Sequence, residues 1–346
     1  MKALVFHGPG RRSWQEAPDP RLIDPGDAVV RVDAVTICGT DLHILGGDVP
    51  AVTEGRILGH EAVGTVVETG LAVGGVKVGD RVLISCITSC ARCSYCRVGR
   101  YGQCREGGGW ILGHLIDGTQ AEYVRVPYAD TSTYKLPDSV SDEAALLLAD
   151  ILPTSYEVGV LNGAVRPGDS VAVVGTGPIG LAAIATARLL SPSLVIGIDK
   201  AAPRLEAAKH FGADLVLTPG GDCEAQVMAA TDGLGADVVM EAVGTPETFE
   251  LCTRLVRPGG HVANIGVHGA SATLHLESLW IKDVTITTGL VDTFSTPTLL
   301  RMTAAGRFDT GAFVTHRFGL HEMQDAYDVF ERAADTGALK VALFRR

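Results

Sequence analysis

A glycine-rich turn between an apolar strand and an apolar helix constrains the fold of this chain most strongly. Residues 170–174 form a continuous apolar run, and residues 181–190 are rich in alanine and leucine. The turn between them consists of Gly175, Thr176, Gly177, Pro178, Ile179 and Gly180. In this pattern the first glycine permits a tight turn, the second lets the backbone approach a pyrophosphate, and the third lets the helix pack on the strand. The segment therefore predicts a dinucleotide site at the amino terminus of the helix.

The next apolar strand ends in a carboxylate that bears on the choice of dinucleotide. Residues 194–198 lead to Asp199, which lies 19 positions after Gly180. A carboxylate at this place accepts hydrogen bonds from the adenosine ribose and repels a 2′-phosphate, so we expect NAD in preference to NADP. Lys200 and Arg204 lie close enough along the chain to weaken that repulsion.

From about Pro153 onward, short apolar segments alternate with helical segments. This alternation predicts an α/β fold with a doubly wound parallel sheet of the Rossmann type. The expected strands after the first two are 215–217, 236–240, 261–266 and 284–288. The expected helices are 181–190, 225–230 and 247–255.

The first 150 residues have a different texture. Short β-rich segments such as 28–35, 61–69 and 81–85 are separated by glycine-rich turns, which indicates a β-barrel-like domain. The chain ends in the strand-like segment 338–344, which could return to this first domain. We therefore expect residues 1–152 and 297–346 to form one domain and residues 153–296 to form the Rossmann domain. A ligand would bind in a cleft between the two.

Four cysteines within fifteen residues predict a closed metal site. They are Cys90, Cys93, Cys96 and Cys104. Spacings of two residues let neighbouring thiolates converge on one zinc ion, and four thiolates leave no open position, so this zinc would be structural. Two disulfides are the alternative. They are disfavoured because no export signal precedes them and the chain is far longer than disulfide-dependent miniproteins.

A second candidate metal site begins at Cys38, 22 positions before His60. A thiolate and an imidazole are ligands that zinc prefers, and a carboxylate would complete a three-ligand catalytic set with a position left for water or substrate. Glu61 and Asp150 are both candidates for the carboxylate, and spacing alone does not choose between them. Taken singly, each of these residues also has an ordinary structural explanation as a core residue, a loop charge or a helix cap.

Composition narrows the class of partner. The net charge of −11 disfavours nucleic acid as a partner. No apolar run reaches membrane-spanning length, and Met1–Phe6 leads directly into strand-like sequence, so we expect a cytoplasmic protein that does not bind membranes.

Taken together, these motifs resemble the zinc-dependent medium-chain alcohol dehydrogenase family. The resemblance rests on Cys-Gly-Thr-Asp-x-His at 38–43, Gly-His-Glu at 59–61, the four-cysteine segment and the nucleotide fingerprint, and it spans the whole chain. It implies a GroES-like β-barrel catalytic domain with two zinc ions beside the Rossmann domain. It also implies a homo-oligomer, either a dimer or a tetramer.

The resemblance assigns roles residue by residue. Cys38 and His60 match the catalytic zinc ligands, and Asp150 matches the third ligand of the bacterial secondary-alcohol branch. Glu61 matches a nearby residue that can replace water as a ligand. Asp41 would orient His60, which zinc sites commonly require.

The remaining roles concern the substrate proton and the cofactor. Thr40 matches the hydroxyl that contacts the substrate oxygen, and His43 matches the outer end of a proton relay. Thr154 matches a threonine beneath the nicotinamide, although a helix-start threonine is the simpler explanation.

The implied reaction is hydride transfer between a small primary or secondary alcohol and NAD, giving an aldehyde or ketone. Trp110 resembles a tryptophan in the pocket of the secondary-alcohol branch, with core packing as the alternative. That branch commonly lacks the full cysteine quartet and uses NADP, so the match to it is partial. Threonine and polyol dehydrogenases share the segment 38–43 and remain an alternative, as do metal-free reductases and non-catalytic nucleotide-binding proteins on the same scaffold. The remaining cysteines, Cys86, Cys223 and Cys252, are expected to be buried apolar residues.

Overall fold

A computed structural model describes residues 1–345 and divides them into two compact units. Unit 1 comprises residues 1–150 and 292–345, and unit 2 comprises residues 151–291. These boundaries lie within a few residues of those expected from the sequence. Among the described residues, none of the helices has the length and apolar character needed to cross a membrane.

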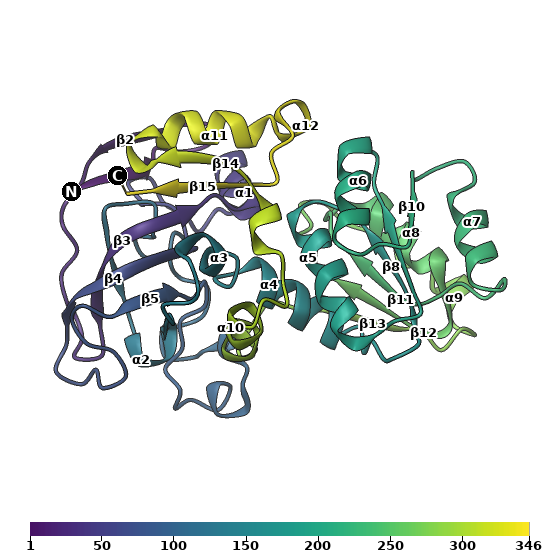
Figure 1. Cartoon of the computed structure of the whole chain (residues 1–346), viewed down its shortest axis with the longest axis horizontal. Coiled ribbons are helices and arrows are strands. Elements are labelled where there is room, and N and C mark those ends of the chain that lie inside the picture. The colour runs from purple at the N-terminus through teal and green to yellow at the C-terminus, as the bar shows by residue number, and fades with distance from the viewer. Residues whose placement is uncertain (346) are drawn as a thin grey trace. The chain divides into compact units, whose positions relative to one another are not determined.

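Unit 2 is built on a six-stranded parallel sheet in the order β10-β9-β8-β11-β12-β13 (Figure 1). In chain order the strands are β8 (Ser170–Val174), β9 (Leu194–Ile198), β10 (Leu215–Leu217), β11 (Ala236–Glu241), β12 (Val256–Asn264) and β13 (Thr285–Thr288). The sequence predicts all six. β12 begins five residues earlier than expected because Val256 already pairs with Ala236, before a register shift in the ladder. The order reverses between β8 and β11, which is the place where doubly wound sheets bind their ligands.

The principal helices of unit 2 follow its strands. They are α5 (Pro178–Ala187), α6 (Ala202–His210), α7 (Cys223–Ala230), α8 (Pro246–Leu255) and α9 (Leu276–Leu279). The unit opens with α4 (Ile151–Thr154), which continues as a π-helix over Ser155–Leu161. α5 begins three residues before the expected start because Pro178 at its first turn has a φ already suited to a helix. It ends at Ala187, and a 3₁₀ turn covers Arg188–Leu190.

Unit 1 contains a sheet in the order β14-β15-β3-β4-β5-β7, with β6 also paired to β3. Its strands are β3 (Ala28–Thr36), β4 (Ala62–Thr69), β5 (Arg81–Ile84), β6 (Tyr123–Val126), β7 (Thr133–Lys135), β14 (Val314–Gly319) and β15 (Lys340–Phe344). Along one edge of β3, residues 28–31 pair with β6 and residues 34–36 pair with β15. β15, yellow in Figure 1, therefore lies beside the purple β3, so the last strand returns to the first domain.

A separate hairpin and short helices complete unit 1. The hairpin is β1 (Lys2–Phe6) with β2 (Arg12–Glu16). The helices are α1 (Gly39–Gly46), α2 (Ala129–Ser132), α3 (Asp142–Leu146), α10 (Thr296–Ala304), α11 (Met323–Glu331) and α12 (Ala333–Thr336).

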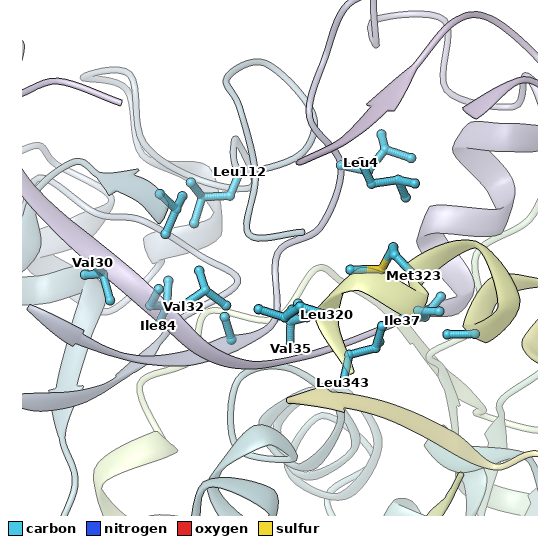
Figure 2. Packing of buried hydrophobic residues seen from close by; sticks show 14 of the residues in the cluster. Leu4, Val30, Val32, Val35, Ile37, Ile84, Leu112, Leu320, Met323 and Leu343 are labelled. Atoms are coloured by element: carbon cyan, nitrogen blue, oxygen red, sulfur yellow. The ribbon is translucent and has the colours of Figure 1, made fainter. Parts of the chain in front are cut away.

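The core of unit 1 joins segments from both ends of the chain. Figure 2 shows Leu4 of β1, Val30 and Val32 of β3, Met323 of α11 and Leu343 of β15 in one buried cluster. A register shift in β3 between residues 32 and 34 changes the alternation, so that residue 35 joins the cluster in place of residue 34. This core fixes the position of the end of β3, which lies just before Cys38.

Candidate metal and dinucleotide sites

The antiparallel pairing of β3 with β4 brings the first group of candidate ligands together. Val35 pairs with Ala62, so the segment that follows β3 and the segment that precedes β4 meet at the same edge of the sheet. Cys38 caps α1 just after β3, and His60 and Glu61 directly precede β4. Asp150 is the last residue of the first of the two chain segments that form unit 1. Each of these four residues offers one ligand atom, and the four atoms lie within 4.8 Å of one another.

The distances define which atoms face the centre of this cluster. Asp150 Oδ2 lies 3.5 Å from Cys38 Sγ and 3.5 Å from His60 Nε2. The other ring nitrogen, His60 Nδ1, faces Asp41 Oδ1 at 3.7 Å. The imidazole therefore presents Nε2 to the thiol and carboxylate and Nδ1 to Asp41.

The protonation of the cluster fits a site for a dication. Burial lowers the pKa of His60, but its hydrogen bonds with Asp150 and Cys38 outweigh burial and leave the pKa well above its usual value. Burial raises the pKa of the Cys38 thiol, and the carboxylates of Glu61 and Asp150 raise it further. In the absence of a cation, protons therefore occupy the sulfur and the ring. A divalent cation would displace them and compensate the buried negative charge.

Glu61 is held by a residue that the sequence analysis did not identify. Lys340 Nζ donates to Glu61 Oε2 at 2.5 Å and to the carbonyl of Ile37 at 3.2 Å, and the hydroxyl of Thr36 also donates to Oε2. Glu61 Oε1 is buried and has no hydrogen-bond partner among the described residues, so it is available to a cation or to its water. Burial lowers the pKa of Lys340, but the charge of Glu61 raises it above its usual value. A single lysine within the apolar run 338–344 was the available sequence signal.

Thr40, His43 and Trp110, the residues expected to contact the substrate or its proton, differ in their distance from the cluster and in their exposure to solvent. Thr40 Oγ1 is 3.7 Å from Cys38 Sγ. His43 is in the last turn of α1, has 36% of its side chain exposed, and bonds through Nδ1 to Asp48 Oδ2 at 2.8 Å. The Trp110 ring lies edge-on to His60, with centroids 6.3 Å apart, and stacks on His114 at 4.2 Å. Trp110 therefore lies beside the metal cluster.

The four cysteines form the second cluster. Their sulfur atoms lie within 4.8 Å of one another, and Cys90 Sγ is 3.9 Å from Cys96 Sγ. Four Zn–S bonds of about 2.3 Å in a tetrahedron would separate the sulfurs by about 3.8 Å. Backbone N–H groups of Arg105 and Cys96 lower the pKa of Cys93 to about 6, which favours the thiolate. No disulfide forms among residues 1–345, and the four thiols match a closed zinc site.

Two glycines of the fingerprint are required by close packing. Gly175 has a φ of 93°, and a Cβ there would lie 2.4 Å from Val243 Cγ2. A Cβ on Gly180 would lie 1.8 Å from the carbonyl oxygen of Gly175. At Gly177, by contrast, the nearest atom would be Arg204 Nη1 at 3.9 Å, so the surface beside the amino terminus of α5 is open. This open backbone can accommodate a pyrophosphate.

The carboxylate of Asp199 is hydrogen-bonded to the backbone of the same turn. Oδ2 accepts from the backbone N–H of Thr176 at 2.8 Å, and Oδ1 accepts from that of Ala201 at 2.9 Å. Arg204 Nη1 lies 4.0 Å from Oδ2, and Lys200 is exposed. Thr176 Oγ1 is buried without a hydrogen-bond partner among the described residues, as expected for a group that a bound ligand would satisfy. Thr154 is the last residue of α4 in the same unit.

Comparison with known proteins decides the family. Residues 24–138 match the alcohol dehydrogenase GroES-like domain, and residues 178–304 match the zinc-binding dehydrogenase domain. An alcohol dehydrogenase of Cupriavidus necator is 40% identical, over 99% of this chain and 98% of its own length. This chain belongs to the zinc-dependent medium-chain alcohol dehydrogenase family.

Two further relatives of this alcohol dehydrogenase agree with that assignment. The apo structure of zinc-dependent alcohol dehydrogenase 2 from Streptococcus pneumonia superposes with a TM-score of 0.96 at 46% identity, over 100% of this chain and 98% of that one. The NADP-dependent isopropanol dehydrogenase of Thermoanaerobacter brockii is 33% identical, over 94% of this chain and 95% of its own length. The family uses zinc and a nicotinamide cofactor, and the clusters and the fingerprint described above fit both.

Proposed function

We propose that this alcohol dehydrogenase interconverts a small primary or secondary alcohol and its aldehyde or ketone, with NAD as hydride acceptor. The observation that carries the proposal is the meeting of Cys38, His60 and Asp150 at one buried point, beside the aromatic face of Trp110. Three protein ligands leave a coordination position for an alcohol oxygen. The relatives named above are an alcohol dehydrogenase and an isopropanol dehydrogenase, and these names do not favour the threonine or polyol alternative.

Different residues of the chain have separate roles in the proposed reaction. Cys38, His60 and Asp150 would hold zinc, which when bound stabilises negative charge on the substrate oxygen. Thr40, beside Cys38, would accept a hydrogen bond from the alcohol hydroxyl and pass its own proton on along a hydrogen-bonded chain, and the partly exposed His43 would release a proton to water at the outer end of that chain. Trp110 supplies an apolar wall against which the substrate carbons pack. The alcohol thus loses one proton to these residues and one hydride to the nicotinamide.

We also infer two zinc ions per subunit and a preference for NAD. The four-cysteine cluster accounts for one structural zinc, and the cluster at Cys38 accounts for one catalytic zinc. The preference for NAD is supported by Asp199, whose carboxylate lies at the end of β9 where the ribose hydroxyls bind.

A homo-oligomer is the remaining part of the proposal. β13 is the edge strand of its sheet, and Trp280 and Ile281 just before it are 74% and 69% exposed. An edge strand beside exposed large apolar side chains is a typical surface for pairing with a second copy. Light scattering on the purified protein would give the number of subunits, and a monomer would exclude this part.

The test is a zinc-quantified sample screened against alcohols, aldehydes, polyols and threonine with each cofactor. We expect two zinc ions per subunit and nicotinamide reduction with small alcohols. A Cys38→Ala variant should retain one zinc and its fold but lose turnover. A sample with both zinc ions that reduces neither cofactor with any alcohol would refute the proposed function.

A further inference from the structure

A chain of buried polar side chains leads through unit 1 to His60. The hydroxyl of Tyr327 in α11 donates to Gln120 Oε1 at 2.7 Å, and Gln120 Nε2 donates to Asp41 Oδ2 at 3.0 Å. Asp41 Oδ1 then faces His60 Nδ1 at 3.7 Å. All four side chains are buried. Residues far apart in the sequence thus converge behind one candidate metal ligand.

The two oxygens of Asp41 have different surroundings. Oδ2 accepts from Gln120 and from the backbone N–H of Cys38 at 2.9 Å. Oδ1 and His60 Nδ1 are both buried, and neither has a hydrogen-bond partner among the described residues. Because buried polar atoms without partners are costly, a small rotation that joins these two atoms is favourable. When a cation displaces the proton of Nε2, a His60 that donates its Nδ1 proton to Asp41 presents the electron pair of Nε2, the nitrogen that faces Cys38 and Asp150.

Tyr327 and the backbone carbonyl of Thr36, which accepts from Gln120 Nε2 at 3.4 Å, together determine which end of the Gln120 amide faces Asp41. The buried Tyr327 hydroxyl keeps its proton, because burial raises its pKa well above the usual value, and it donates that proton to Oε1. The amide NH₂ is therefore directed to Asp41. A reversed amide would set its oxygen against the carboxylate, which is repulsive.

The tyrosine ring is itself fixed from outside. The Arg12 guanidinium lies 4.6 Å from the ring centroid, and it pairs with Asp328 at 3.0 Å and with Glu331 at 2.7 Å. Both carboxylates belong to α11, and Asp328 is the next residue after Tyr327. Tyr327 is also a buried member of the apolar core of unit 1. The hydroxyl of Tyr327 therefore has little freedom to leave Gln120.

We propose that Gln120 and Tyr327 are positioning residues for the catalytic zinc. They hold the Asp41 carboxylate so that it accepts from Nδ1 of His60 and leaves Nε2 to the metal. This inference rests on the proposed zinc site at Cys38, His60 and Asp150. Neither residue touches the substrate or the metal, so each acts only through Asp41 and His60.

The test compares Tyr327→Phe and Gln120→Met with a matched control, Tyr134→Phe. Tyr134 is a tyrosine of β7 in the same unit whose hydroxyl donates to the carbonyl of Thr293 at 3.2 Å, outside this chain of side chains. Cobalt placed selectively in the catalytic site reports the ligand geometry through its visible spectrum, and its release to EDTA gives a rate. We expect release to be about tenfold faster for Gln120→Met and a few-fold faster for Tyr327→Phe, since outer partners of zinc-bound histidines contribute about 10- to 100-fold to metal affinity.

Three measurements separate positioning from general loosening of the fold. The cobalt spectrum should shift in both variants and remain unchanged in Tyr134→Phe, whatever the melting temperatures. The value of kcat should fall more than KM rises, because binding of the alcohol is not directly altered. Spectra and release rates equal to those of the unaltered protein in both variants would overturn the proposal. Because cobalt binding is read without turnover, that outcome is distinct from a failure of the proposed alcohol oxidation.

Discussion

Lys340 and Glu61 form an ion pair in the interior of unit 1, with Nζ and Oε2 2.5 Å apart and both side chains buried. Lys340 comes from the last strand and Glu61 from the residue before β4, so the pair also joins the C-terminal segment to the metal cluster. A buried charge is tolerated only when it is compensated, so each partner depends on the other.

Replacing Lys340 with methionine should therefore destabilise the protein strongly. The Glu61 carboxylate would remain buried without its cation, and we expect the free energy of unfolding to fall by about 3–5 kcal/mol. Urea unfolding at neutral pH measures the change. Adding Glu61→Gln should recover much of the loss. Lys135→Met is the control, because it breaks a surface pair with Asp80 and should have little effect. Equal losses for the two lysine variants would contradict the role assigned to Lys340.

Cys96→Ser should separate the structural zinc from the catalytic one. Cys96 is the buried member of the four-cysteine cluster, where burial raises its pKa to about 12, so a stable thiolate there depends on a bound cation. We expect the variant to lose one zinc per subunit and to melt at a lower temperature, while the folded fraction keeps its kcat. Metal analysis, thermal unfolding and activity on the same sample test this, with Cys223→Ala as the control that keeps both zinc ions. Loss of turnover before loss of folding would show that the two clusters are not independent.

The motifs with local physical causes were predictable from the sequence. The fingerprint needs a strand, a turn and a helix in succession, so the sequence alone predicted β8 and the helix after it. The same holds for the four cysteines, whose short spacings suffice to bring their sulfurs together. His60 and Cys38 lie farther apart in the sequence, but each borders one of two strands that pair, β4 and β3. The pairing of these two strands is enough to bring both residues to one place.

Residues joined only by the tertiary fold were not predictable. Gln120 and Tyr327 are 207 positions apart, and no periodicity or motif connects them. Lys340 lies 279 positions from Glu61, and its only signal was a charge inside an apolar strand. Trp110 left two alternatives open, a pocket wall and core packing, and the structure places its ring beside His60. For Tyr327 and Lys340 the partner is set by how α11 and β15 pack in unit 1.

Asp199→Gly should shift the cofactor preference toward NADP. The glycine removes the acceptor for the ribose hydroxyls and the charge that repels a 2′-phosphate, so kcat/KM with NAD should fall by about tenfold or more. The same change removes the bonds to Thr176 and Ala201, so Asp199→Asn is needed as the companion variant, since it keeps an acceptor and loses the charge. Steady-state rates with both cofactors give the ratio. If neither variant alters the ratio, Asp199 has no part in the discrimination.

Asp237 should make the stability of unit 2 depend on pH on the acid side. Its Oδ2 accepts from the backbone N–H of Ser170 at 2.7 Å and from the hydroxyl of Ser170 at 2.6 Å, and its Oδ1 accepts from Arg257 Nε at 2.6 Å. Burial raises the pKa of Asp237, but these partners outweigh burial and the pKa lies below its usual value. A carboxylate with a lowered folded-state pKa contributes its full stabilisation above its unfolded pKa of about 4 and loses it as the pH falls further.

The variant Asp237→Asn should therefore be less stable at pH 7 by about 1–3 kcal/mol, the range for losing hydrogen bonds to a charged group. The difference from the unaltered protein should narrow as the pH falls below about 4, because protonation removes the same charge from the native side chain. Thermal unfolding of both proteins in parallel at pH 7, 5 and 3.5 measures the difference, and acid release of zinc affects both alike. Asp232→Asn, at an exposed loop position before β11, is the control and should follow the unaltered protein at every pH. A difference for Asp237→Asn that stays constant from pH 7 to pH 3.5 would show that the charge of Asp237 does not stabilise the start of β8 and β11.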